Sequence, residues 1–243
     1  MKTILLKFSG PLQSWGTDSH FEIRHTDLHP SKSAVLGLIA AALGWRRNDE
    51  RIAALNRFTF AVRVDQPGSI LKDYHTAHKP EIKKGGILSY RTYVTKRYYL
   101  QDAVFVVALG IAEKTEADKI VDALRSPYFQ PYMGRRALPL PVDFLLGIVD
   151  DTPMSVLRNF PWQAADWYKK KEQNKGNACK KRLSVFTEHS MDGSVSKIRR
   201  DHVLSLAASG RRYLPRLEYE HVCEIEIPEL KQEHDAFAAV GGV

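Results

Sequence analysis

Apolar and polar positions over residues 1–150 predict the order strand, helix, strand, strand, strand, helix, strand, if the polar excursion from Thr76 to Leu100 is an insertion. Unbroken apolar runs favour buried strands, and apolar positions at helical spacing favour amphipathic helices. This order is close to the βαββαβ arrangement of a ferredoxin-like α+β fold. The expected strands are 4–8, 102–111 and 144–149, with a hairpin over 59–76 turning at Pro67-Gly68, and the expected helices are 28–45, 48–58 and 113–127.

The length of 243 residues suits one large domain or two small ones. The pattern over residues 151–243 is less regular than that of the first 150. Within it, the tract 169–182 is rich in lysine and contains glycine and asparagine, which is typical of a basic loop. The other expected segments are a loop with aromatic anchors over 153–168, a hairpin over 184–200 that turns at 191–194, and a final strand over 221–227.

The net charge of +8 predicts attraction to polyanions, with nucleic acid first and an anionic membrane second. The longest apolar stretch, residues 34–45, is shorter than the about 20 residues that span a bilayer. We expect no membrane partner, because no strongly amphipathic basic helix stands out that could lie on an anionic membrane surface. Only two cysteines occur, Cys179 and Cys223, and they lie far apart. This usage is typical of a reducing cytoplasm and leaves no cysteine-rich zinc site.

A loop with the sequence GPLQSWG follows the first expected strand, at residues 10–16. Its glycines allow another group to approach the backbone closely, and Pro11 stiffens the turn. The indole of Trp15 is unfavourable in water, so it either packs into the core or faces a planar group.

The stretch HPSKSAVLG places Ser31, Lys32 and Ser33 at the start of the first expected helix. Free backbone N–H groups and the helix dipole attract phosphate at such a position. The alternative, and the better one for this stretch alone, is ordinary serine capping beside a solvated lysine. The GxxxxGK[ST] spacing of a nucleoside triphosphate site is absent.

The excursion from Thr76 to Leu100 interleaves cations with tyrosines around a Gly85-Gly86 apex. Tyrosine rings stack on unpaired bases, and lysine and arginine hold phosphates. The excursion fits two structures equally well: a ribbon that binds nucleic acid, or a surface hairpin whose tyrosines pack against the domain.

A proline-rich segment, residues 127–141, carries Arg135 and Arg136 directly after Gly134. Prolines stiffen such a segment, and a well-positioned guanidinium grips phosphate with two hydrogen bonds. The alternative is that one arginine pairs with a carboxylate while the other is solvated.

The stretch Asp73-Tyr74-His75 is the candidate for acid–base chemistry, since histidine is the usual proton shuttle near neutral pH. It does not establish a catalytic geometry by itself. No HExxH or HxH pattern is present, so we expect no metal site and no cofactor.

Five stretches occur in a characteristic order: GPLQSWG, PSKSAVLGLIAAALG, KDYHT, YRTYV with YYLQDAVFVVAL, and PYFQPYMGRRALPL. Together they resemble the RAMP-superfamily subunit of type I-E CRISPR Cascade complexes that binds the crRNA 5′ handle. The resemblance covers residues 1–150 and is weak over 151–243.

This resemblance implies two domains: a ferredoxin-like, RRM-like domain over residues 1–150, with an inserted β-hairpin thumb at about residues 76–100, and a smaller C-terminal β region over residues 151–243. It implies a subunit that holds the crRNA 5′ handle, caps the backbone of repeated subunits, contacts the large subunit and meets target DNA through the complex. The thumb would fold over the RNA beside the handle–spacer junction. Because a separate subunit cuts the precursor RNA in type I-E systems, the resemblance implies no catalysis.

The alternative function is a metal-independent endoribonuclease that processes CRISPR repeats, as the equivalent protein does in type I-C systems, with His75 as the candidate catalyst. For the RNA-binding function, the expected contacts come from four stretches. They are Gln13 and Trp15 near handle bases; Ser31, Lys32 and Ser33 at a phosphate; Tyr74, His75, Arg91 and Tyr93 on the thumb; and Arg135 and Arg136 on the RNA backbone.

Overall fold

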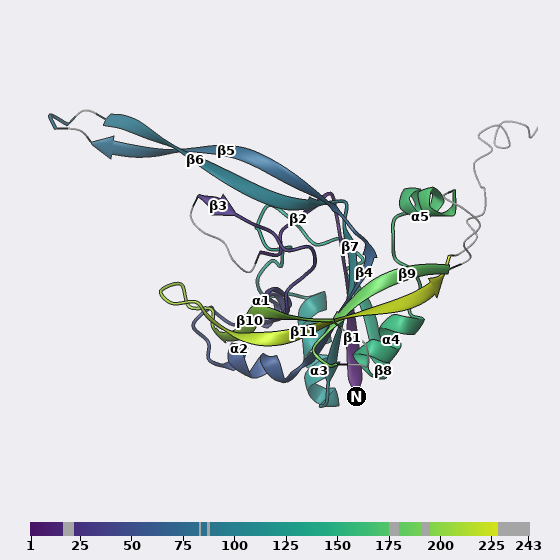
Figure 1. Ribbon diagram of the computed structural model, residues 1–243. Helices are drawn as coiled ribbons and strands as arrows, with labels where there is room; N and C mark the ends of the chain where they lie inside the picture. Colours follow the sequence, from purple (N-terminus) through teal and green to yellow (C-terminus); the bar gives the residue numbers. More distant parts are fainter. Residues whose placement is uncertain (17–21, 83, 87, 175–179, 191–194, 228–243) are drawn as a thin grey trace, which may run out of the picture.

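The computed structural model describes residues 1–16, 22–82, 84–86, 88–174, 180–190 and 195–227. An antiparallel seven-stranded sheet forms the body, and a four-stranded sheet carries a long hairpin that projects from it (Figure 1). The body strands are β1 (Lys2–Ser9), β4 (Thr59–Gln66), β7 (Val104–Ile111), β8 (Leu145–Asp150), β9 (Lys180–Thr187), β10 (Val195–Ser205) and β11 (Arg212–Glu226). The second sheet contains β2 (Leu12–Gln13), β3 (Ile23–Arg24), β5 (Ser69–Ile82) and β6 (Leu88–Gln101).

The centre of the body sheet has the strand order β4-β7-β1-β8. Helix α1 (Lys32–Ala42) lies between β1 and β4 in the chain, and α3 (Lys114–Arg125) lies between β7 and β8. This confirms the predicted βαββαβ arrangement of a ferredoxin-like fold. The short helix α2 (Arg51–Ala54) and a 3₁₀ turn (Leu55–Arg57) follow α1.

Local signals set the ends of α1, which is shorter than the helix predicted over 28–45. Ser31 is the N-cap, and its side chain accepts a hydrogen bond from Ala34 N. Gly44 follows the helix with a φ of +78°, a conformation that glycine adopts without strain.

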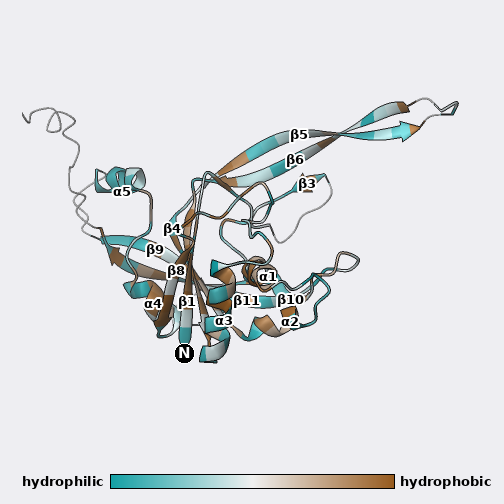
Figure 2. Cartoon of the chain, turned by 180° about the vertical axis from the view of Figure 1, so that it is seen from behind, coloured by the Kyte–Doolittle hydropathy of each residue, from teal (hydrophilic) through white to brown (hydrophobic). Residues whose placement is uncertain are grey.

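Hydrophobic clusters cover both faces of the body sheet. On one face, α1 and α3 pack over Phe8, Phe60 and Phe105; on the other, α4 (Pro153–Asn159) packs over Leu5 and Val106. Burying one such side chain fully contributes about 1.5–3 kcal/mol. Figure 2 shows α1 mostly brown and the outer helix α5 (Asp166–Gln173) mostly teal, as expected for a core helix and a surface helix.

The C-terminal strands extend the same sheet in the order β4-β9-β11-β10, so the expected division at residue 150 is not a break in the sheet. The predicted hairpin over 184–200 is wrong, because β11 lies between β9 and β10. Alternation identifies strands but does not choose their partners, and β11 pairs with both neighbours. The expected turn at 191–194 lies outside the described residues.

Helices occur where the sequence predicted loops. In place of the loop over 153–168, α4 begins with Pro153 after the N-cap Thr152, which is a favourable start. The basic tract 169–182 contributes to α5 and to β9, and its residues 175–179 lie outside the described ranges. Asp166 in the first turn of α5 and Lys170 in its last turn complement the helix dipole.

The projecting hairpin is longer than predicted. Strands β5 and β6 pair from Ser69 with Gln101 to Ile82 with Leu88, so the hairpin begins at Ser69 and not at Thr76. The predicted hairpin over 59–76 is wrong, because Pro67-Gly68 joins the body sheet to the projecting hairpin. No helix in the described ranges has the length and apolar character needed to cross a membrane.

Candidate nucleic-acid interface

A hollow of about 1300 Å³ is lined by segments of the body and by the end of β3. In Figure 1, the β5–β6 hairpin projects over the side of the body where β3 and the turn between β10 and β11 lie. Segments that are distant in the sequence line the hollow: the loop after β2, the end of β3, the exposed side of α1, residues 45–48, residues 129–136 and the turn between β10 and β11. The hollow is therefore built by the tertiary fold and not by one local motif.

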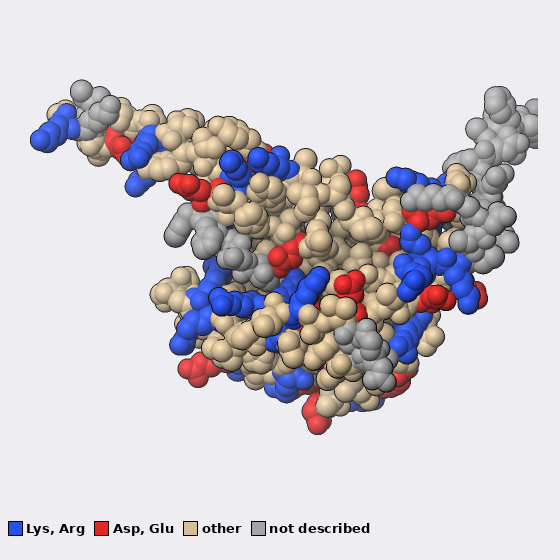
Figure 3. Space-filling view, viewed as in Figure 1, with Lys and Arg blue, Asp and Glu red and all other residues tan. Residues whose placement is uncertain are grey.

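Positive charge dominates the hollow. Among the described residues, no aspartate or glutamate lines it. In Figure 3, blue side chains gather on the body below the hairpin, over the end where β10 and β11 meet α1. The lining arginines are Arg24, Arg46, Arg47, Arg135, Arg136 and Arg211.

Aromatic rings lie between these arginines. Trp45, Tyr132 and Tyr213 line the hollow, and so does His25, whose ring stacks on Tyr98 with a centroid distance of 5.2 Å. Cations that contact phosphates and rings that stack on bases are what proteins use to bind single-stranded nucleic acid.

Arg135 joins the lining of the hollow to the root of the hairpin. Its Nη2 donates to the carbonyl oxygens of Arg24 at 3.2 Å and Tyr98 at 3.0 Å, and its guanidinium lies 4.1 Å from the ring centroid of Tyr99. Arg135 Nη1 and Arg97 Nε are buried and have no hydrogen-bond partner among the described residues. Unsatisfied buried cationic donors are unfavourable. The part of the Arg135 side chain that stays exposed lies in the lining of the hollow.

Gly134 holds the Arg135 segment against the N-terminal loop. It has a φ of +82°, and a Cβ there would lie 1.7 Å from the carbonyl oxygen of Ser14. We expect Gly134→Ala to lower the free energy of unfolding by about 1–3 kcal/mol, because the backbone must shift. Urea denaturation measures this, with Gly210→Ala as the control, since a Cβ there meets no atom within 4 Å. Equal stability of the two variants would contradict the close packing.

The predicted base contact of Gln13 is wrong. Gln13 is 0% exposed, its Nε2 donates to the carbonyl oxygen of Ala103 at 2.7 Å, and its Oε1 accepts from Trp15 Nε1 at 2.9 Å. Trp15 is 2% exposed and meets Phe8 edge to face at 5.0 Å. Trp15 packs into the core, which is one of its two predicted alternatives, and it also lies in the lining of the hollow. Gln13 satisfies the indole N–H that this packing buries.

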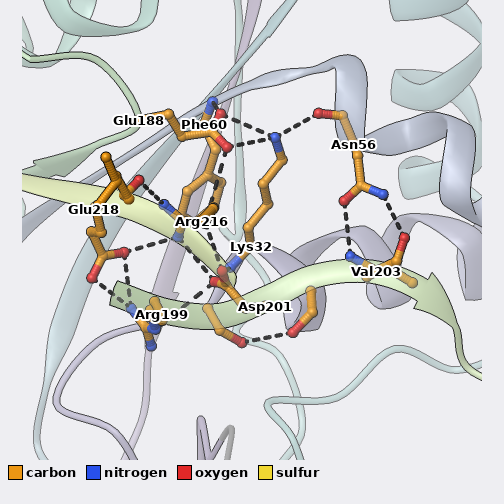
Figure 4. Close-up of polar contacts among 12 residues, drawn as sticks. Lys32, Asn56, Phe60, Glu188, Arg199, Asp201, Val203, Arg216 and Glu218 are labelled. Carbon is orange, nitrogen blue, oxygen red and sulfur yellow. Dashed lines mark hydrogen bonds and ion pairs between the residues drawn. The ribbon is translucent and has the colours of Figure 1, made fainter. Parts of the chain in front are cut away.

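The predicted phosphate contact of Lys32 is also wrong in this structure. Its side chain is 2% exposed, and its Nζ donates to Glu188 Oε1 at 2.8 Å and to the carbonyl oxygen of Asn56 at 2.7 Å (Figure 4). Burial lowers the pKa of Lys32, and Glu188 opposes this effect. Ser31 is buried and caps α1, and Ser33 is partly exposed; both serines lie in the lining of the hollow.

Lys32 belongs to a buried network of charges that ties the start of α1 to β10 and β11 (Figure 4). Arg216 donates to Asp201 with distances of 2.6 and 2.9 Å and to Glu218 at 2.9 Å. Asp201 also accepts from the backbone N–H of Lys32 at 2.8 Å. The network fixes the two strands whose connecting turn carries Arg211 into the hollow.

The expected hairpin residues lie on two different faces of the ribbon. Cross-strand pairing places Tyr74 on one face and His75, Arg91 and Tyr93 on the other. Tyr74 is 66% exposed, and the Arg91 guanidinium lies 5.2 Å from the ring centroid of Tyr93. These residues do not line the hollow, and their contact with RNA remains a prediction.

Of the sequence-predicted residues, Ser33, Arg135 and Arg136 are the ones that reach the hollow with accessible side chains. Sequence reasoning missed Arg24, Trp45, Arg46, Arg47 and Arg211. The pair Arg46-Arg47, directly after the residues that end α1, was the available signal. Among the described residues, no cluster of three or more histidine, cysteine, aspartate or glutamate side chains could hold a metal ion.

Comparison with known proteins identifies the family. The sequence profile described as CRISPR-associated protein (Cas_Cas5) matches residues 3–213. The chain belongs to the Cas5 family. This Cas5 protein is 33% identical over 178 residues to the CRISPR system Cascade subunit CasD of Escherichia coli (strain K12), which covers 68% of this chain and 80% of the relative.

Solved structures agree with this family assignment. A chain of a CRISPR RNA-guided surveillance complex superposes with a TM-score of 0.72 at 33% identity, covering 93% of this chain and 91% of the other. A second solved structure, described as a Cas protein, superposes with a TM-score of 0.60 at 27% identity, covering 93% of this chain and 95% of the other. The seven-stranded body with its projecting hairpin is thus a Cas5-type fold.

Proposed function

We propose that this Cas5 protein is a crRNA-binding subunit of a Cascade surveillance complex and that its hollow holds the crRNA 5′ handle. The observation that carries the proposal is the lining of the hollow, where arginines and aromatic rings converge and no carboxylate intervenes among the described residues. The similarity to a Cascade subunit supports the choice of crRNA among nucleic acids.

The hollow suits a single strand better than a duplex. Aromatic side chains such as Trp45 and Tyr132 need unpaired bases to stack on, and arginines spread over several segments follow an irregular backbone. The buried network around Asp201 and Arg216 holds part of this surface on rigid strands.

The proposal also covers the hairpin and the contacts with neighbouring subunits. The β5–β6 hairpin folds over the RNA beside the handle, and the protein caps the backbone of repeated subunits and contacts the large subunit. An exposed ribbon with cations such as Arg91 on one face supports contact with the RNA strand.

We also propose that the protein holds the RNA without cutting it. Repeat RNA incubated with the purified protein in EDTA is expected to stay intact while it remains bound, which gel electrophoresis and a binding assay measure on the same samples. The competing function is a metal-independent nuclease with His75 as catalyst.

The matched control for this test is His78→Ala, an exposed histidine on the same strand as His75. Site-specific cleavage that His75→Ala abolishes and His78→Ala retains would overturn the non-catalytic function. Absence of RNA binding by the wild-type protein would overturn the proposed function as a whole.

A further inference from the structure

We propose that Trp45 is a stacking platform for one unpaired base of the bound RNA. The inference rests on the proposed function of the hollow and names the position of a base within it. Trp45 directly follows Gly44, where the chain leaves α1, and its backbone N–H donates to the carbonyl oxygen of Ala40 at 2.8 Å. The main chain of Trp45 is therefore anchored to the last turn of the helix.

A neighbouring ion pair contacts the Trp45 ring. The guanidinium carbon of Arg51 lies 4.5 Å from the ring centroid. Arg51 in turn donates to both carboxylate oxygens of Asp49, with distances of 2.9 and 2.6 Å. A guanidinium on one side of an indole leaves the rest of the ring for another planar group.

The remaining exposed part of the indole belongs to the hollow. Trp45 is half-buried, packs against the core cluster and lines the hollow at the same time. A partly anchored ring loses little conformational freedom when a base stacks on it, which favours binding.

The surroundings indicate a nucleotide and not an apolar protein segment. Arg46 and Arg47 follow Trp45 in the chain, are exposed and line the same hollow. A base on the indole with its phosphates near these guanidinium groups satisfies both kinds of side chain, whereas an apolar peptide leaves the arginines unpaired. The ligand is thus an unpaired nucleotide of an RNA strand.

Tryptophan fluorescence tests the stacking directly. The chain has four tryptophans. Trp15 also lies in the lining of the hollow, but it is only 2% exposed and therefore offers no ring face to a base. Trp162 is 5% exposed, and Trp167 is 54% exposed on α5, which does not contribute to the hollow. Titration with an oligonucleotide of the crRNA 5′ handle is expected to quench emission of the wild type and of Trp167→Phe. The quenching is expected to be largely lost in Trp45→Phe.

Affinity provides the second measurement, by anisotropy of the labelled handle oligonucleotide. We expect Trp45→Ala to weaken binding about 10-fold and Trp45→Phe to retain most of the affinity, because phenylalanine also stacks on bases. Undiminished quenching in Trp45→Phe, or wild-type affinity in Trp45→Ala, would overturn the stacking while leaving the proposed function intact. Failure of the wild-type protein to bind the oligonucleotide would overturn both.

Discussion

Replacing Glu218 by glutamine is expected to lower the free energy of unfolding at pH 7 by about 3 kcal/mol. Burial raises the pKa of Glu218, but the hydrogen bond from His29 and the charges of Arg199 and Arg216 outweigh this effect and lower the pKa from 4.5 to about 2. A difference of this size corresponds to about 3 kcal/mol of stability, since one pKa unit is about 1.4 kcal/mol. Removing the carboxylate also leaves buried guanidinium groups without one partner.

The same carboxylate sets a pH dependence. Because its pKa is lower in the folded state, its contribution is complete above about pH 5 and is lost as the pH falls from about 5 to about 2. Urea denaturation at several pH values measures this, with Glu224→Gln on the same strand as the exposed control. The role of Glu218 would be contradicted if the two variants lost the same free energy of unfolding at pH 7. It would also be contradicted if the free energy of unfolding fell equally steeply below pH 5 in both variants.

The network around Glu218 connects segments that carry part of the hollow. Its members come from the segment before α1, from α1 itself and from β9, β10 and β11 or the residues just after them. Most of these segments lie far apart in the sequence, so the tertiary fold brings them together. Buried ion pairs contribute little net stability but are strongly destabilising when one partner is removed, which favours a single packing arrangement.

Much of the central fold could be predicted from local signals. The apolar run of β7, the cap at Ser31 and the glycine after α1 are each determined by a few adjacent residues. Strand partners could not be predicted in the same way. Pro67-Gly68 is a turn sequence, but whether β5 returns to β4 or pairs with β6 depends on contacts over the whole hairpin.

The candidate site was harder to predict, because residue type does not reveal burial. Gln13 and Lys32 have side chains suited to RNA, yet their partners Ala103 and Glu188 lie 90 and 156 positions away in the chain. Arg135 and Arg136 were predicted because a rigid segment presents them. Trp45 was missed because a single aromatic residue at the end of a helix carries no functional signal, and only the fold places it in the same hollow as Arg135.

The second large effect is expected for RNA affinity. The triple variant Arg46→Ala/Arg47→Ala/Arg136→Ala removes three exposed arginines that line the hollow. We expect it to bind the crRNA 5′ handle about 100-fold more weakly at low salt, because each arginine loses a charge-assisted contact with a phosphate. The matched control, Lys114→Ala/Lys119→Ala/Arg125→Ala on α3, removes the same charge from exposed residues that do not line the hollow.

The salt dependence of handle binding by these two variants and the wild type tests the central claim most directly. Anisotropy titrations at several salt concentrations give the slope of log K against log salt, which changes by about 0.7 for each phosphate contact on a single strand. If the hollow is the RNA site, the slope of log K against log salt is expected to change by about 2 units in the triple arginine variant and by little in the α3 control. Equal slopes and equal affinities for the two variants would contradict it.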